Sequence, residues 1–188
     1  MLAPLLFAVL LSVSPQNDPQ SAGLQALDHQ DYQQAQKIFS DLAAADPKDY
    51  FALFNLALAE TGLHQEPAAA EHYRRVLALK PGLYEAELNL GILLLLEHQP
   101  SEAVPLLQDA AKQRPGQERA ERYLGDSLLA TNDLAGAAVA YQAALAINPR
   151  NGATELGLGQ ALERQNKLDE AAPHYRQAAA LDPNLKSY

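Results

Sequence analysis

The sequence predicts an all-α fold, a solenoid of five 34-residue helix-turn-helix repeats, and two observations lead to this prediction. Alanine and leucine dominate the apolar residues, tryptophan is absent and aromatic residues make up 6% of the chain, which favours helices over strands. Prolines also recur at an interval of 34 residues, at Pro47, Pro81, Pro115, Pro149 and Pro183. A fixed period of this length is typical of repeat proteins.

Other positions of the period support the same division. The repeats are expected to cover residues 16–49, 50–83, 84–117, 118–151 and 152–185, followed by a short tail at 186–188. The eighth position of each repeat is small: Gly23, Ala57, Gly91, Gly125 and Gly159. The twentieth is always alanine: Ala35, Ala69, Ala103, Ala137 and Ala171. The twenty-fourth is bulky: Phe39, Tyr73, Leu107, Tyr141 and Tyr175.

Each repeat is expected to fold as two helices. The first covers about thirteen residues with apolar side chains at helical spacing, as in Leu53, Leu56 and Ala57. A polar turn follows, and the second helix ends before the proline, which cannot continue a helix. Small residues at positions eight and twenty let the two helices approach closely, and the bulky residue at position twenty-four fills the space beside them. The first helix of repeat one is expected to be short, beginning near Asp18 and Pro19.

This pattern of a small residue at position eight, alanine at twenty, a bulky residue at twenty-four and proline at thirty-two resembles the tetratricopeptide repeat family. The resemblance covers residues 16–185, about nine-tenths of the chain, and implies a right-handed α-solenoid with a concave face lined by the first helices. Such units cannot bury their apolar faces alone and are stabilised by stacking on their neighbours. The chain departs from the family at position four, which is often a large aromatic residue there and is here Pro19, Leu53, Glu87, Glu121 and Glu155.

The resemblance also implies which residues face the concave groove, because positions two, five, nine, twelve and thirteen do so in the family. The groove is then apolar over repeats two and three and basic at repeat four. The candidate partner-binding residues are Phe51, Phe54, Leu58, Leu88, Ile92, Leu95, Arg119 and Arg122. Exposed apolar clusters with a polar rim are typical of binding sites. The alternative is that the apolar members pack on neighbouring helices as ordinary core.

Two interpretations are open for the basic pair. Arg119 and Arg122 share a helix face at a spacing of three residues, so they could bind a carboxylate at the end of the apolar trough. Alternatively they form local ion pairs, Arg122 with Glu118 and Arg119 with Glu85. We favour the ion pairs.

The first residues differ from the rest of the chain. Leu2–Val13 is a 12-residue apolar run, too short to span a bilayer but suited to the apolar segment of a secretory signal. Residues 1–15 are therefore interpreted as a signal peptide or membrane anchor, and the protein as exported, in the bacterial periplasm or on the envelope. Against this, no basic residue precedes the run, and Pro15 directly follows the small residues at a cleavage site. If residues 1–15 are not a true signal, the protein is cytoplasmic.

The sequence offers no constellation for chemistry. A net charge of −9 argues against nucleic-acid binding, which requires cations opposite phosphates. There is no cysteine, and no nucleophile elbow, phosphate-binding loop or HExxH motif occurs. His64 and His98 occupy the same turn position in adjacent repeats, too far apart to bind one ion. We expect no catalysis, no cofactor, no metal site and no small-molecule substrate.

Two functions are consistent with these features. The first is a non-catalytic scaffold that holds a peptide or helix of an unidentified protein partner in the concave groove. The second is a structural subunit of an envelope or secretion complex that acts through its C-terminal end. There the last helix is expected to present Leu168, Ala172, Tyr175 and Ala179, with no further repeat in the sequence to cover them. That end would also permit self-association.

Overall fold

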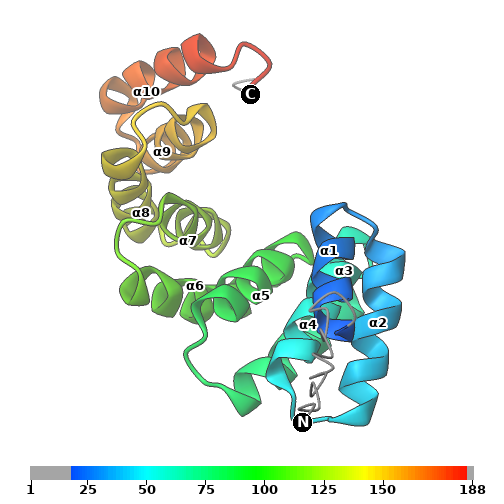
Figure 1. Ribbon diagram of the computed structural model, residues 1–188. Coiled ribbons are helices and arrows are strands. Elements are labelled where there is room, and N and C mark those ends of the chain that lie inside the picture. Colours follow the sequence, from blue (N-terminus) through cyan, green and yellow to red (C-terminus); the bar gives the residue numbers. More distant parts are fainter. Residues whose placement is uncertain (1–17, 186–188) are drawn as a thin grey trace, which may run out of the picture.

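The computed structural model describes residues 18–185, and this part of the chain forms ten α-helices and no strand. The helices are α1 (Pro19–Asp28), α2 (Tyr32–Ala45), α3 (Tyr50–Gly62), α4 (Glu66–Leu79), α5 (Tyr84–Leu96), α6 (Pro100–Gln113), α7 (Glu118–Ala130), α8 (Leu134–Ile147), α9 (Gly152–Arg164) and α10 (Leu168–Leu181). Each helix packs on the next, and the pairs follow one another along an open arc (Figure 1). The predicted all-α solenoid is confirmed.

The helix ends follow from local sequence. Asp18 caps α1 by accepting a hydrogen bond from the backbone amide of Gln20, and Pro19 supplies the first helical residue, as expected for the short first helix. The turn inside each pair contains one residue with a left-handed backbone, with φ between 56° and 67°. These residues lie 34 positions apart: Gln30, His64, His98, Asn132 and Asn166. The two turn histidines are exposed, and their prediction as surface turn residues is confirmed.

The contact between positions eight and twenty-four joins the two helices of each pair. A Cβ atom added to Gly125 would lie 2.7 Å from the ring of Tyr141, and one added to Gly91 would lie 2.6 Å from Leu107. Both partners are buried. No side chain larger than hydrogen fits at these glycines without displacing the neighbour. The expected close approach of the helices is thus confirmed.

Stacking of the pairs is uneven along the arc. First helices contact each other between α1 and α3, α5 and α7, and α7 and α9. Among adjacent first helices, α3 and α5 are the least closely packed. The ribbon shows the arc turning at this junction (Figure 1). The stack is therefore least tightly packed along its concave face between repeats two and three.

The C-terminal helix departs in one respect from expectation. Leu168 is 58% exposed, and Ala172 and Ala179 are exposed as well. Tyr175, however, packs against α9, where a Cβ atom on Gly159 would lie 2.9 Å from its ring, and its hydroxyl donates to Glu163. Tyr175 therefore belongs to the pair contact of repeat five and not to the end face, because it occupies position twenty-four like Tyr73 and Tyr141.

No helix within residues 18–185 has both the length and the apolar character needed to cross a membrane. The apolar run Leu2–Val13 lies outside the described residues.

The pair contact predicts a stability effect at Gly125. Substitution Gly125→Val forces a branched side chain against the buried ring of Tyr141 and should lower the free energy of unfolding by about 1–3 kcal/mol. Urea denaturation followed by circular dichroism measures this. Ala146→Val introduces the same branched side chain at an exposed position of α8 and should have a much smaller effect, although alanine is the better helix former and glycine the poorer one. Equal effects of the two substitutions would contradict the pair contact.

Candidate functional site

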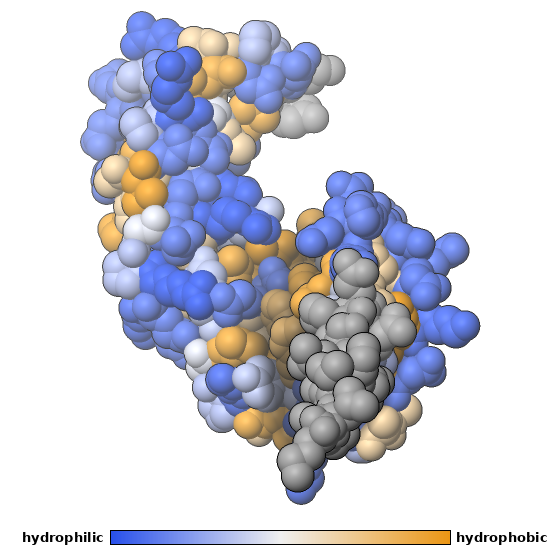
Figure 2. Space-filling model, viewed as in Figure 1, coloured by the Kyte–Doolittle hydropathy of each residue, from blue (hydrophilic) through white to orange (hydrophobic). Residues whose placement is uncertain are grey.

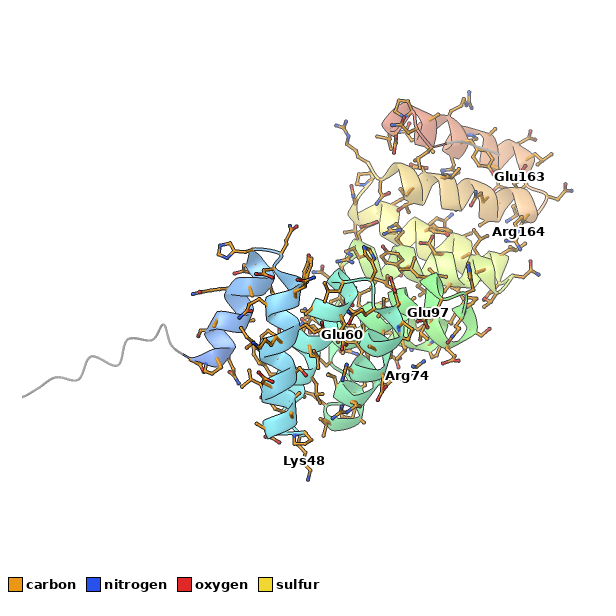
Figure 3. The ribbon with its side chains drawn as sticks, turned by 90° about the vertical axis from the view of Figure 1, so that its right-hand side faces the viewer. Lys48, Glu60, Arg74, Glu97, Glu163 and Arg164 are labelled. Atoms are coloured by element: carbon orange, nitrogen blue, oxygen red, sulfur yellow. The ribbon has the colours of Figure 1, made fainter. Side chains whose placement is uncertain are left out.

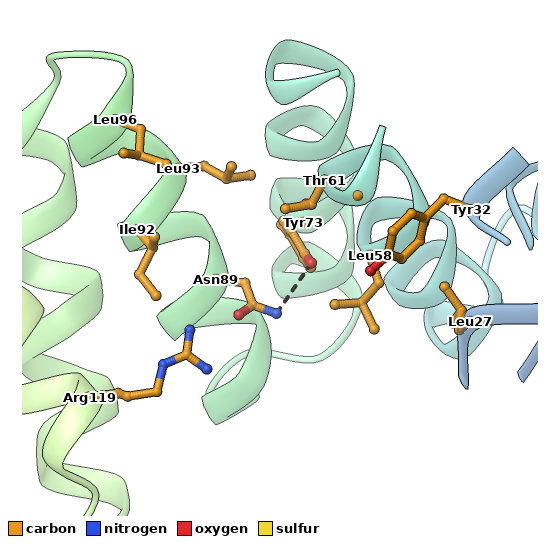
Figure 4. Close-up of a pocket in the computed structure, with 11 residues that line it drawn as sticks. Leu27, Tyr32, Leu58, Thr61, Tyr73, Asn89, Ile92, Leu93, Leu96 and Arg119 are labelled. Atoms are coloured by element: carbon orange, nitrogen blue, oxygen red, sulfur yellow. Dashed lines mark hydrogen bonds between the residues drawn. The ribbon is translucent and has the colours of Figure 1, made fainter. Parts of the chain in front are cut away.

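A cavity of about 390 Å³ opens on the concave face at the junction of α3 and α5. Its apolar walls come from three repeats, with Leu27 from α1, Leu58 from α3, and Ile92, Leu93 and Leu96 from α5, and Arg119 from repeat four lies at the rim (Figure 4). In the space-filling view, apolar surface gathers in the hollow of the arc, while the outer surface is largely polar (Figure 2). The loose packing of α3 on α5 thus leaves an apolar hollow on the concave face.

The polar groups on the floor of the cavity have hydrogen-bond partners. The hydroxyl oxygen of Tyr73 accepts a hydrogen bond of 3.2 Å from Nδ2 of Asn89 (Figure 4). Burial raises the pKa of Tyr73 to about 12, so its hydroxyl keeps its proton at physiological pH. Thr61 donates through Oγ1 to the carbonyl oxygen of Ala57 at 2.8 Å. These groups therefore carry no charge.

The N-terminal wall depends on a glycine at the end of α3. A Cβ atom added to Gly62 would lie 2.5 Å from the ring of Tyr32, so the ring packs directly on this backbone. The position equivalent to Gly62 holds Asp28, Leu96, Ala130 and Arg164 in the other repeats. Repeat two therefore has a local adaptation that brings an aromatic ring of repeat one into the cavity.

The charge at the opposite rim comes from Arg119. This side chain is exposed and lines the cavity, and no carboxylate within residues 18–185 lies within 4.0 Å of it. The expected partner, Glu85, instead pairs with Arg114, with Nη1 and Oε1 2.6 Å apart. The prediction of an Arg119–Glu85 pair was thus wrong, because the carboxylate of Glu85 is paired with Arg114 at the end of α6.

Arg122 is held by its own helix. Its Nε lies 3.6 Å from Oε1 of Glu118, and its Nη1 donates to Oδ2 of Asp126 at 3.3 Å. The guanidinium also stacks on the ring of Tyr123, 3.9 Å from the ring centroid. The predicted Glu118–Arg122 pair is confirmed. Only Arg119 of the two arginines is left to meet a ligand at this rim.

The structure places the eight candidate residues in different environments. Leu58, Ile92 and Arg119 line the cavity. Leu88 is only 5% exposed and belongs to the hydrophobic core, and Leu95 is half-buried against that core.

The two phenylalanines pack sideways. The ring of Phe51 meets that of Phe39 edge-on, with centroids 6.4 Å apart, and the ring of Phe54 meets that of Tyr73 at 5.6 Å. Both are half-buried against the core, as the alternative interpretation expected. Whether any of the eight binds a partner stays a prediction.

Sequence reasoning missed the contribution of repeat one. Leu27 and Tyr32 were not among the candidates, although the glycine at position thirteen of repeat two departs from the other repeats and was an available signal. Leu93 was also missed, since it lies at position ten and is not a groove position in the family.

A second hollow of about 370 Å³ continues the concave face at repeats four and five. Arg164 donates from Nη1 to the carbonyl oxygen of Leu129 at 3.0 Å and from Nη2 to Oδ1 of Asn132 at 2.9 Å. Glu163 lies beside it at the same end of α9 (Figure 3). The groove is therefore apolar in its N-terminal half and polar in its C-terminal half. No group of three or more potential metal ligands occurs in the part of the chain that the structure describes.

Comparison with known proteins identifies the family. The tetratricopeptide repeat model matches residues 21–84 and 88–153, and a second tetratricopeptide repeat model matches residues 156–185. The chain belongs to the tetratricopeptide repeat family. No curated protein matches the sequence.

Solved structures of this family have the same arrangement of helices. A structure of MamA from Desulfovibrio magneticus RS-1 is 22% identical in sequence and superimposes with a TM-score of 0.81. The alignment covers 90% of the present chain and 96% of the MamA chain. A structure of MamA AMB-1 is 23% identical in sequence and gives a TM-score of 0.82, with an alignment that covers 89% of the present chain and 99% of the MamA chain. At this level of identity the similarity is one of fold.

Proposed function

We propose that the protein is a non-catalytic scaffold that binds a short segment of a partner protein in its concave groove. The observation that supports this best is the cavity between α3 and α5, in which apolar walls end at Arg119, a cation with no ion-pair partner within residues 18–185. Tetratricopeptide repeat proteins are typically interaction scaffolds, and the apolar walls and single cation suit a peptide better than a small polar substrate.

The chemistry of the cavity defines the segment. An apolar side chain seated between Leu58 and Ile92 leaves water and contributes roughly 1.5–3 kcal/mol. A carboxylate that follows it reaches the guanidinium of Arg119, whose planar donors suit such a group. After the costs of association, two or three such contacts give a micromolar complex.

Export is part of the proposal. The apolar run Leu2–Val13 and the polar residues that follow it suit a secretory signal or an anchor, so the scaffold would work in the periplasm or on the envelope.

The structural-subunit hypothesis remains the second candidate. It is supported by the exposed apolar side chain of Leu168, together with Ala172 and Ala179 on the last helix. In this case the partner, or another copy of the chain, would cover the outer face of α10.

A pair of substitutions separates the two candidates. Leu96→Asp places a charge in the cavity and Leu168→Asp places one on α10, and the original side chains are similarly exposed, at 63% and 58%. Peptides selected from a displayed random library on residues 16–188 should bind Leu96→Asp at least about tenfold more weakly than wild type. Leu168→Asp should bind like wild type. The reverse result would exclude the groove and favour the end face.

If the protein is exported, cell fractionation should show it outside the cytoplasm. With a C-terminal tag on residues 1–188, the protein should fractionate with the periplasm or envelope, and a variant lacking residues 2–13 should stay in the cytoplasm. Recovery of both forms from the cytoplasm would contradict the proposal.

A further inference from the structure

We propose that a groove on the outer face of repeat four binds a lysine or arginine side chain of a partner protein. The groove has a volume of about 400 Å³ and opens between the second helices α6 and α8, with α7 as its floor. Its lining includes Glu121, Leu124, Leu128 and Val139. It is separate from the concave cavity and therefore goes beyond the function proposed above.

Glu121 lines this groove and has no partner among residues 18–185. Its side chain is half-buried, and within residues 18–185 no hydrogen bond or ion pair reaches its carboxylate. Burial raises the pKa of Glu121. A carboxylate that is partly removed from water is costly unless it is paired. A cation from outside would supply the missing partner.

Equivalent glutamates in the neighbouring repeats do have partners. Position four of repeat three is Glu87, whose carboxylate accepts a hydrogen bond from Nε2 of Gln113 on α6. Position four of repeat five is Glu155, and its Oε2 lies 2.7 Å from Nδ1 of His174 on α10. In both repeats the second helix of the pair satisfies the glutamate of the first.

Repeat four keeps the glutamate and lacks both donors. The position of Gln113 is occupied by Ile147, and the position of His174 is occupied by Ala140. Neither side chain can donate a hydrogen bond. Ala140 also lines the groove, so the small residue leaves space where repeat five has a histidine.

The shape and charge of the groove suit a long basic side chain. Leu124 and Leu128 form an apolar floor, and Val139, which is 66% exposed, forms part of the wall. Lysine and arginine combine an aliphatic stem with a cationic head, so the stem covers the apolar floor while the head pairs with Glu121. Asp133 at the rim carries a second negative charge, although its Oδ1 already accepts from the backbone amide of Gly136 at 2.9 Å.

The charge of the whole chain favours the same partner. A net charge of −9 attracts basic surfaces and repels acidic ones. A small inorganic cation would leave the apolar floor exposed, so we assign the groove to a side chain carried by a protein.

Matched peptide sets test this site. One set contains random uncharged 12-residue peptides with a single central arginine, and the other has the uncharged isostere citrulline at that place. The arginine set should bind residues 16–188 at least about tenfold more tightly than the citrulline set. Glu121→Gln should abolish this difference. Glu87→Gln, the same substitution at the same repeat position, should leave the difference unchanged because Gln113 already satisfies Glu87. Circular dichroism checks that both variants are folded.

The outcomes also distinguish this site from the concave groove. Leu96→Asp should leave the preference for arginine intact. Equal binding of the two sets, or a preference that survives Glu121→Gln, would overturn the outer site. A preference that survives Glu121→Gln would place the arginine elsewhere on the chain, which overturns this inference and leaves the proposed scaffold function standing.

Discussion

The packing of a bulky side chain at position twenty-four on a small residue at position eight is the contact on which the rest of this structure depends. In repeat four the ring of Tyr141 lies so close to Gly125 that even a methyl group would displace it. This contact fixes the distance between the two helices of a pair, and the pair then stacks as a unit. Because the contact recurs in each repeat, the remaining positions are free to differ without loss of the fold.

Both proposed binding sites lie where one repeat differs from its neighbours. Between repeats two and three the first helices stand apart, and an apolar cavity opens between Leu58 and Ile92. In repeat four, apolar side chains replace the donors that satisfy Glu87 and Glu155, and Glu121 has no partner in the described part of the chain. Both surfaces result from a local departure inside an otherwise constant framework.

The sequence predicted the framework well because the framework is periodic. Three features depend only on contacts within one repeat: the interval between prolines, the glycines at position eight and the start of α1 at Pro19. The sequence of a single repeat is therefore enough to predict them. The Glu118–Arg122 pair was predictable for the same reason, since its members lie one helical turn apart.

The site was harder to predict because it depends on contacts between repeats. The sideways packing of Phe51 on Phe39 requires the position of α2 relative to α3, which no local spacing defines. Even within repeat three, Glu85 pairs with Arg114 instead of Arg119 because the end of α6 returns to the start of α5, a contact that local spacing does not define either. Tyr32 lines the cavity because Gly62 has no side chain, which leaves space for the ring. The glycine is visible in the sequence, but its effect is clear only when the positions of the two stacked repeats are known.

Photo-crosslinking in the cells that make the protein tests the central claim most directly. Benzoylphenylalanine is introduced in place of Leu96, inside the concave cavity, and in a second strain in place of Leu168 on α10. If the groove is the working surface, irradiation yields a covalent adduct with a partner protein from position 96 and none from position 168. An adduct that forms from position 168 alone would contradict the groove and place the function at the end of the solenoid.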